Sequence, residues 1–242
     1  MKIHAYLMCY NEEVMLPFTL KHYGQFCDKI TVYYDNQTTD HSKEIINSFS
    51  GTEVIEFQGR GLNDILLRDI KNNMWRSSRG EYDWVIVADM DELLYCPNIE
   101  ERLRYLREAK ITIVRPKGYD MISEALPNLD RPIIDQIRQG IENSNESKCV
   151  LFNPNKIENI NYFYGAHNCE PEGQVRYYYH EDIKLLHYKL LSFDYYNTRR
   201  TIALSRIPQD CLDKGFGSQF NESIEARLSM FNNYLSKAKE VI

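Results

Sequence analysis

The chain has 242 residues, a length that suits one large domain, and hydrophobic residues make up 43% of it, enough for a substantial core. Its formal net charge of -6 argues against a protein that holds nucleic acid electrostatically over its whole surface. No apolar run approaches the roughly 20 residues of a membrane span, and the N-terminal apolar stretch is too short for a signal peptide. We therefore expect a soluble, cytoplasmic protein, with peripheral attachment to a membrane left open.

The cysteines form no Cys-x-x-Cys pair, so neither a zinc ribbon nor a thioredoxin-type motif is present. They are spread along the chain as Cys9, Cys27, Cys96, Cys149, Cys169 and Cys211. This spread is typical of reduced, mostly buried thiols in a cytosolic protein.

Strand and helix patterns alternate through the first half of the chain. The predicted strands cover residues 3–8, 29–34, 52–57 and 84–88. The predicted helices cover residues 12–27 and 64–78, with a third between them that Asp40 or Ser42 caps and that ends at Phe49. Such alternation favours an α/β fold with a mainly parallel sheet.

The second half is less regular. It predicts a helix over residues 99–107, a short helix over 133–141 within a loop, and strands over 111–115, 149–152, 175–179 and 183–188. Residues 222–242 place Ile224, Leu228, Phe231 and Leu235 at helical spacing, which predicts an amphipathic C-terminal helix. We expect this helix to dock on its own domain. The alternative is a contact with a membrane surface or with a second copy of the chain.

The sharpest feature is an acidic cluster after a strongly apolar strand. The strand over residues 84–88 runs directly into Asp89, Asp91 and Glu92. Burying carboxylates is costly, so the chain must emerge from the sheet there, and open α/β sheets bind ligands at the carboxyl ends of their strands. The three acids repel one another, and a divalent cation such as Mn²⁺ or Mg²⁺ relieves that repulsion. The alternative is a solvated acidic turn.

Short motifs then follow one another in a recognisable order. In the first half they are Cys9-Tyr10-Asn11-Glu12-Glu13, then Tyr33-Tyr34-Asp35-Asn36-Gln37-Thr38-Thr39-Asp40, then Lys71-Asn72, then Asp89-Met90-Asp91. In the second half they are Ser147-Lys148, then Gly165-Ala166-His167, then Leu186-His187-Tyr188. The first set resembles family 2 of the GT-A glycosyltransferases, with Lys71 where that family has Arg. The second set resembles the family 92 branch.

The resemblance covers roughly residues 1–200 and implies a GT-A, Rossmann-like domain over residues 1–220, followed by a C-terminal helix over 221–242. Residues 1–98 would form the nucleotide-sugar half and residues 99–220 the acceptor half. The implied activity is metal-dependent transfer of a sugar from a nucleoside diphosphate, with UDP-sugar expected. The implied acceptor is a carbohydrate, a lipid-linked glycan or another hydroxyl group, as in polysaccharide biosynthesis.

The resemblance also implies roles for single residues. Those expected to bind the nucleotide sugar are Tyr10, Asn11, Asp35, Lys71, Asp89, Lys148 and His167. Tyr10 would lie against the base, and Asp35 would accept a hydrogen bond from it. Asp89, Asp91 and His187 would hold the metal, although a lone histidine near aromatic residues also suits a core position. Lys148 would offset diphosphate charge, or would be a solvated lysine.

The resemblance favours inversion at the anomeric carbon, and an inverting enzyme needs a general base for the acceptor hydroxyl. The candidates are Asp120, which follows a predicted strand and Gly118, and Glu170 after His167. An aspartate in that setting also suits a simple turn. Two other functions stay open: a metal-dependent phosphoryl-transfer enzyme, and a carbohydrate-binding module that has lost catalysis.

Overall fold

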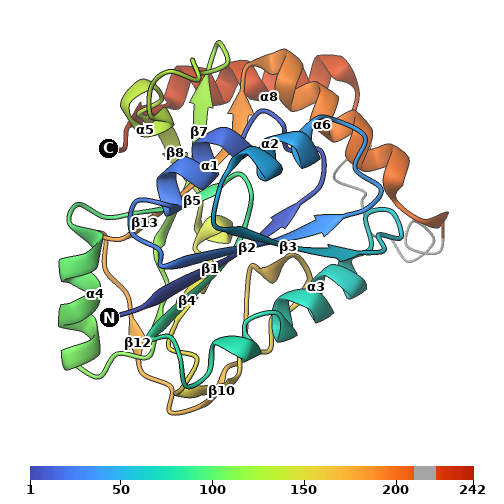
Figure 1. The fold of residues 1–242 in the computed structure, drawn as a ribbon. Helices are drawn as coiled ribbons and strands as arrows, with labels where there is room; N and C mark the ends of the chain where they lie inside the picture. Colours follow the sequence, from blue (N-terminus) through green and yellow to red (C-terminus); the bar gives the residue numbers. More distant parts are fainter. Residues whose placement is uncertain (210–221) are drawn as a thin grey trace.

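A mainly parallel sheet flanked by helices forms the centre of the computed structural model, which describes residues 1–209 and 222–242 (Figure 1). The strands of these residues are β1 (Ile3–Cys9), β2 (Lys29–Asp35), β3 (Thr52–Phe57), β4 (Trp84–Asp89), β5 (Glu92–Tyr95), β6 (Ile113–Val114), β7 (Lys117–Ser123), β8 (Gln139–Glu142), β9 (Leu151–Phe152), β10 (Ile157–Asn159), β11 (Glu172–Gly173), β12 (Tyr177–Tyr178), β13 (Lys184–Leu191) and β14 (Lys239–Glu240). The α-helices are α1 (Leu16–Tyr23), α2 (Ser42–Ser48), α3 (Asp64–Asn73), α4 (Ile99–Glu108), α5 (Ile133–Gln136), α6 (Phe193–Arg206) and α8 (Ile224–Lys237). Short 3-10 helices are η1 (Arg76–Ser78), η2 (Ser144–Glu146) and η3 (Tyr164–Ala166). The predicted α/β class with a C-terminal helix is confirmed.

The parallel strands bring their carboxyl ends to one edge of the sheet. Across the described residues the strand order is β12-β6-β9-β4-β1-β2-β3, and the pairs β4–β1, β1–β2 and β2–β3 are parallel. In this register Met8 pairs with Asp89 and Cys9 pairs with Tyr34. The segments that follow β1, β2 and β4, which hold Tyr10, Asp35 and Asp89, therefore lie close together.

Alternating residues of the central strands pack into a hydrophobic core on each face of the sheet. In β1, Ala5 and Leu7 join the core that also holds α1 and α2, whereas Tyr6 and Met8 join the core that holds Trp75 beyond α3. Figure 1 shows α1 and α2 on one side of the strands and α3 on the other. The sheet is thus covered on both faces, and its carboxyl edge stays available for a site.

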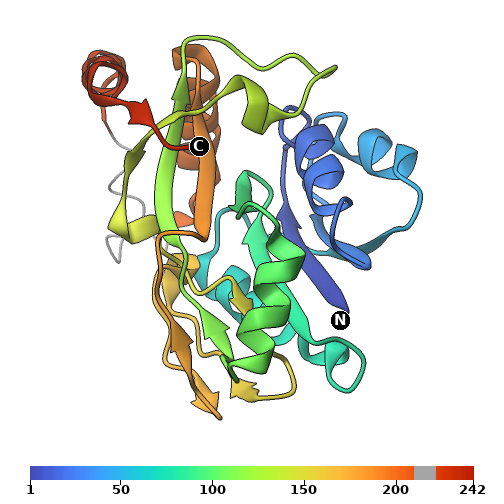
Figure 2. The same ribbon diagram turned by 90° about the vertical axis from the view of Figure 1, so that its left-hand side faces the viewer.

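A second sheet carries the later site residues. Its order within the described residues is β14-β8-β7-β13-β5, and β5 follows β4 directly after the turn at Met90 and Asp91. The register places His187 of β13 opposite Glu92 of β5 and beside Asp120 of β7. Figure 2 shows β7 and β13 side by side, facing the N-terminal half across the molecule. The acidic turn after β4 therefore lies where the two sheets meet.

Several element boundaries differ from the sequence expectation. The helix expected over 12–27 is shorter, α1 alone, because the chain turns through residues 13–15 and Pro17 occupies the first helical turn. The helix expected over 64–78 ends at Asn73 and resumes as η1. The stretch that holds β8 was expected to be loop and short helix, and α6 was not predicted.

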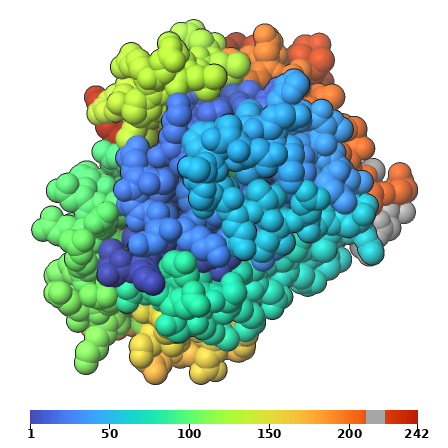
Figure 3. Space-filling view, in the orientation of Figure 1, coloured from blue at the N-terminus to red at the C-terminus, as the bar shows by residue number. Residues whose placement is uncertain are grey.

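In the space-filling view, N-terminal residues cover most of one face, with C-terminal residues along its upper and right edges (Figure 3).

The C-terminal helix docks on its own domain through only part of its apolar stripe. Phe231 is buried with Ile122, Leu190 and Tyr196, and Leu235 packs beside them. Ile224 and Leu228 are exposed instead.

The described cysteines are free thiols, as expected. Cys211 and the expected domain boundary at 220/221 lie outside the described residues. Within the described part of the chain, no helix combines the length and the hydropathy needed to cross a bilayer.

Candidate active site

A cavity of about 620 Å³ opens at the carboxyl edge of the parallel strands. It is lined by every residue predicted to bind the nucleotide sugar or the metal: Tyr10, Asn11, Asp35, Lys71, Asp89, Asp91, Lys148, His167 and His187. Its wall also contains residues of α6, among them Arg199 and Arg206, which the sequence pattern did not single out. Residues separated by more than half of the chain thus meet in one hollow.

Asp89, the last residue of β4, is held by cations of the protein itself. The Lys71 ammonium lies 2.6 Å from Asp89 Oδ1, and the Lys148 ammonium lies 3.9 Å from Oδ2. The Asp89 backbone N–H donates to Glu92 Oε2 at 3.0 Å. Burial alone would raise the pKa of Asp89, but Lys71 and Lys148 hold that pKa below its ordinary value. Asp89 is therefore ionised at neutral pH.

Asp91 lies between an imidazole and a guanidinium. Its Oδ2 is 3.3 Å from His187 Nε2 and accepts a hydrogen bond from Arg199 Nη2 at 2.9 Å. Burial opposes its ionisation, yet His187 and Arg199 hold the pKa of Asp91 far below its usual range. Burial likewise favours the neutral ring of His187, but the Asp91 carboxylate raises the pKa of His187 to about 10. The His187 ring is thus protonated at neutral pH in the metal-free protein.

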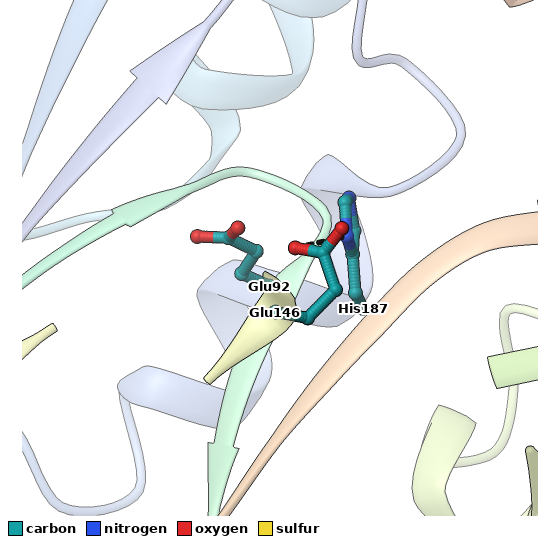
Figure 4. Close-up of side chains that lie close together, drawn as sticks. All are labelled: Glu92, Glu146 and His187. Atoms are coloured by element: carbon teal, nitrogen blue, oxygen red, sulfur yellow. Dashed lines mark ion pairs between the residues drawn. The ribbon is translucent and has the colours of Figure 1, made fainter. Parts of the chain in front are cut away.

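A second acidic group surrounds Lys148. Glu92, Glu146 and His187 come from β5, η2 and β13, and their ligand-type atoms lie within 4.8 Å of one another (Figure 4). The Lys148 ammonium contacts Glu92 and lies 3.3 Å from Glu146 Oε2. Sequence reasoning noticed Glu92 only as part of the acidic turn and missed Glu146. No periodic pattern points to Glu146, and its one sequence signal is its place two residues before Lys148.

The residues near His187 fit a divalent cation. Glu146 Oε2 and His187 Nδ1 are buried and 3.1 Å apart, but neither has a properly aligned hydrogen bond among the described residues. Buried ligand-type atoms that lack a well-aligned hydrogen bond could coordinate an ion, although Glu146 Oε2 already lies 3.3 Å from the Lys148 ammonium. Glu92 is already engaged by Lys148 and by the Asp89 N–H. Glu146 is paired with Lys148 as well, and the described residues whose ligand-type atoms group closely enough for one ion are Glu92, Glu146 and His187. Carboxylate oxygen together with imidazole nitrogen is a mixture that suits Mn²⁺.

Tyr10 and Asp35 form a separate corner of the cavity, and Arg206 of α6 occupies it. The Arg206 guanidinium lies 3.1 Å from the centre of the Tyr10 ring and donates to Asp35 Oδ2 at 2.7 Å. Asp35 is buried, and Gly59 packs so closely beneath its carboxylate that a Cβ there would clash with it. The predicted neighbours Tyr10 and Asp35 therefore do converge, on a guanidinium that sequence reasoning missed.

The two residues predicted as the general base are not among the described residues that line the cavity. Asp120 is buried beside it: Oδ1 lies 2.7 Å from the Lys189 ammonium, and Oδ2 accepts from Asn143 at 2.9 Å. Lys189 does line the cavity. Glu170 is exposed. Both assignments stay predictions, and Asp120 is the one connected to the cavity through a direct contact.

Glu12 is a further carboxylate in the cavity wall. It follows β1, is buried, and accepts a hydrogen bond from Arg199 Nη1 at 2.6 Å. Burial raises the pKa of Glu12 to about 7, with Arg199 opposing that rise. Arg199 thus bridges Glu12 and Asp91, and ties α6 to the ends of β1 and β4.

Comparison with known proteins gives little beyond this geometry. No family model matches the chain, and no curated protein matches it. Among solved structures, S. aureus TarS matches with a TM-score of 0.42 and 14% identity, over 64% of this chain and 28% of that one. S. aureus TarS 1-349 matches with a TM-score of 0.46 and 12% identity, over 84% of this chain and 65% of that one. The chain thus spans less than two thirds of the length of either, and function has to be argued from its own residues.

Proposed function

We propose that the chain is a metal-dependent glycosyltransferase that takes its sugar from a nucleoside diphosphate, with UDP-sugar as the donor class. One observation carries the proposal: a single cavity joins a carboxylate–histidine cluster, at Asp89, Asp91 and His187, to a corner formed by Tyr10 and Asp35. The first suits a cation with a diphosphate, and the second suits a planar ring with an N–H at its edge.

In this proposal the base lies against Tyr10 and donates to Asp35 Oδ2, the buried oxygen that accepts from Arg206 in the nucleotide-free protein. Uracil has such an N–H, and so has guanine. Asn11 lies beside Tyr10 in the cavity wall and contacts the loop that follows β2: its side-chain oxygen accepts a hydrogen bond from the Thr39 N–H at 2.8 Å. The nucleoside end of the donor is thus fixed at the ends of β1 and β2.

The diphosphate end would lie against Lys71, Lys148 and His167, which line the other part of the cavity. Lys71 and Lys148 would oppose the negative charge that grows on the leaving diphosphate when the bond to the sugar breaks. Asp89, Asp91, Glu146 and His187 would hold Mn²⁺ or Mg²⁺, and such an ion, when bound, supplies further positive charge to the diphosphate. His187 must give up a proton to serve as a ligand.

The acceptor hydroxyl must lose a proton, and we assign that role to Asp120 in preference to Glu170. Asp120 touches the cavity through Lys189, whereas Glu170 is exposed. Lys189 would have to move off Asp120 Oδ1 for the carboxylate to reach an acceptor. Inversion at the anomeric carbon is part of the same proposal, since only an inverting enzyme needs this base on the face opposite the diphosphate.

The test is a donor panel of UDP-, GDP- and other nucleotide sugars with Mn²⁺, in which release of the nucleoside diphosphate is measured. We expect release from one donor class that stops when Mn²⁺ is chelated and when Asp91 is replaced by asparagine. Release of the nucleoside monophosphate and a sugar phosphate in place of the nucleoside diphosphate would favour the phosphoryl-transfer alternative. Failure to bind either a nucleotide or Mn²⁺ would favour the carbohydrate-binding module that has lost catalysis.

A further inference from the structure

The last turn of α6 is fastened into the corner formed by Tyr10 and Asp35. The Arg206 carbonyl accepts from the Leu62 N–H at 2.8 Å, and its guanidinium also approaches the Gly61 carbonyl at 3.4 Å. Gly61 has a φ of +71°, and a Cβ there would clash with the Arg206 carbonyl oxygen. Backbone and side chain of Arg206 are therefore both anchored on the loop before α3.

The guanidinium makes the two contacts expected of a nucleobase. It is planar and covers the Tyr10 ring at 3.1 Å, as a stacked base would. It also donates an N–H to Asp35 Oδ2, the atom that would accept from a ring N–H. The Arg206 side chain is 15% exposed and that of Asp35 only 4%, so the space between them is closed. A base and this guanidinium cannot occupy the corner together.

We propose that Arg206 occupies the nucleobase subsite of the nucleotide-free protein and that the base of an incoming nucleoside diphosphate displaces it. This inference rests on the proposed function and deepens it. We expect the subsite to select planar rings with an N–H donor at the edge, because the Arg206 guanidinium that fills it is planar and donates an N–H. Displacement also frees the end of α6 from Tyr10 and Asp35, while Arg199, two turns earlier, can keep its contacts with Glu12 and Asp91.

The arrangement has a clear physical use. If neither Arg206 nor a ligand occupied the corner, Asp35 would be a buried carboxylate with no cation beside it, which is costly. Arg206 removes that cost, and the nucleobase must then compete with an intramolecular ion pair. The apparent dissociation constant is the intrinsic one divided by the fraction of molecules with an open subsite. The intramolecular pair therefore weakens nucleotide binding.

The test compares Arg206→Ala with wild type and with Ser205→Ala, an exposed neighbour on the same helix. Binding of uridine and of uridine diphosphate is measured by isothermal titration with Mn²⁺ present. Arg206→Ala should bind both probes about tenfold more tightly, because an open subsite no longer has to be vacated. Ser205→Ala should match wild type. Arg206→Lys keeps a cation for Asp35 but cannot lie flat on Tyr10, so it should show a smaller gain.

The outcomes separate the inference from the proposed function. Wild type that binds uridine diphosphate, with Arg206→Ala and Arg206→Lys binding equally or more weakly, would overturn the displacement alone. It would make Arg206 a ligand of the base or a bystander. Failure of wild type and of both variants to bind any nucleoside diphosphate would overturn the proposed function and this inference with it. Should Arg206→Ala not fold, the gain in Arg206→Lys decides the matter by the same criteria.

Discussion

Each carboxylate at the end of β4 already has a cation of the protein beside it. Lys71 pairs with Asp89, Arg199 and His187 pair with Asp91, and Lys148 pairs with Glu92. The sequence predicted that these acids would repel one another until a metal arrived. In the folded chain the repulsion is offset without one, so removing a single carboxylate leaves cations unpaired. Substitutions here should therefore affect stability as well as catalysis.

Asp91→Asn is the sharpest such substitution. We expect at least about a 100-fold loss of sugar transfer, because the variant lacks a charged ligand for the cation and a partner for His187. We also expect the metal-free protein to lose about 1–3 kcal/mol of unfolding free energy, since the depressed pKa of Asp91 means that the folded state favours its charge. Rate assays and urea unfolding measure the two effects. Asp130→Asn, at an exposed position, should show neither.

His187 should make metal binding depend on pH. Its pKa of about 10 in the metal-free protein means that a cation must displace a proton from the ring at neutral pH. Below pH 10 each fall of one pH unit should therefore weaken the apparent Mn²⁺ affinity by about tenfold, in addition to any effect of the carboxylates. Titration of Mn²⁺ between pH 6 and 8 measures the slope. A slope that is the same in His187→Ala would remove His187 from the ligand set.

At the scale of elements, the sequence predicted the parallel strands well. The strands β1 to β4 are runs of apolar and β-branched residues, and their pairing places Asp35 and Asp89 at one edge. The sequence failed to predict α6, which buries only Tyr196. This helix lines the cavity with Arg199, Arg200 and Arg206 as well as with Tyr196, Ile202 and Ala203. A helix without an apolar stripe has no periodic signal. Arg199 and Arg206 were missed for that reason, and Glu146 was missed because η2 is a single short turn.

The C-terminal helix α8 offers a matched pair of substitutions. Phe231 is 3% exposed and packs on β7, β13 and α6, whereas Leu228 is 40% exposed on the same helix. Phe231→Ala should cost about 3–5 kcal/mol of unfolding free energy, and Leu228→Ala should cost a few tenths. Urea denaturation measures both. Similar costs at the two positions would mean that Leu228 is covered in solution, as by a second copy of the chain.

At the scale of the whole molecule, the two sheets and α6 together enclose the cavity. The larger sheet supplies Tyr10, Asp35 and Asp89, the second supplies His187, and α6 supplies Arg199 and Arg206. A ligand that spans these parts binds the folded chain and not the unfolded one. It must therefore raise the melting temperature in proportion to RT ln(1 + [L]/Kd). Stabilisation of the whole fold thus reports on the site.

The most direct measurement is a thermal-shift panel of nucleoside diphosphates, each with and without Mn²⁺. We predict that one of them, with uridine diphosphate expected, raises the melting temperature more with Mn²⁺ than the two ligands do separately. A ligand at a hundred times its dissociation constant adds about 2.7 kcal/mol, which such a scan resolves. The excess should vanish in Asp91→Asn. An unchanged melting temperature with every nucleotide, with or without Mn²⁺, would contradict the assignment of a nucleotide-sugar glycosyltransferase.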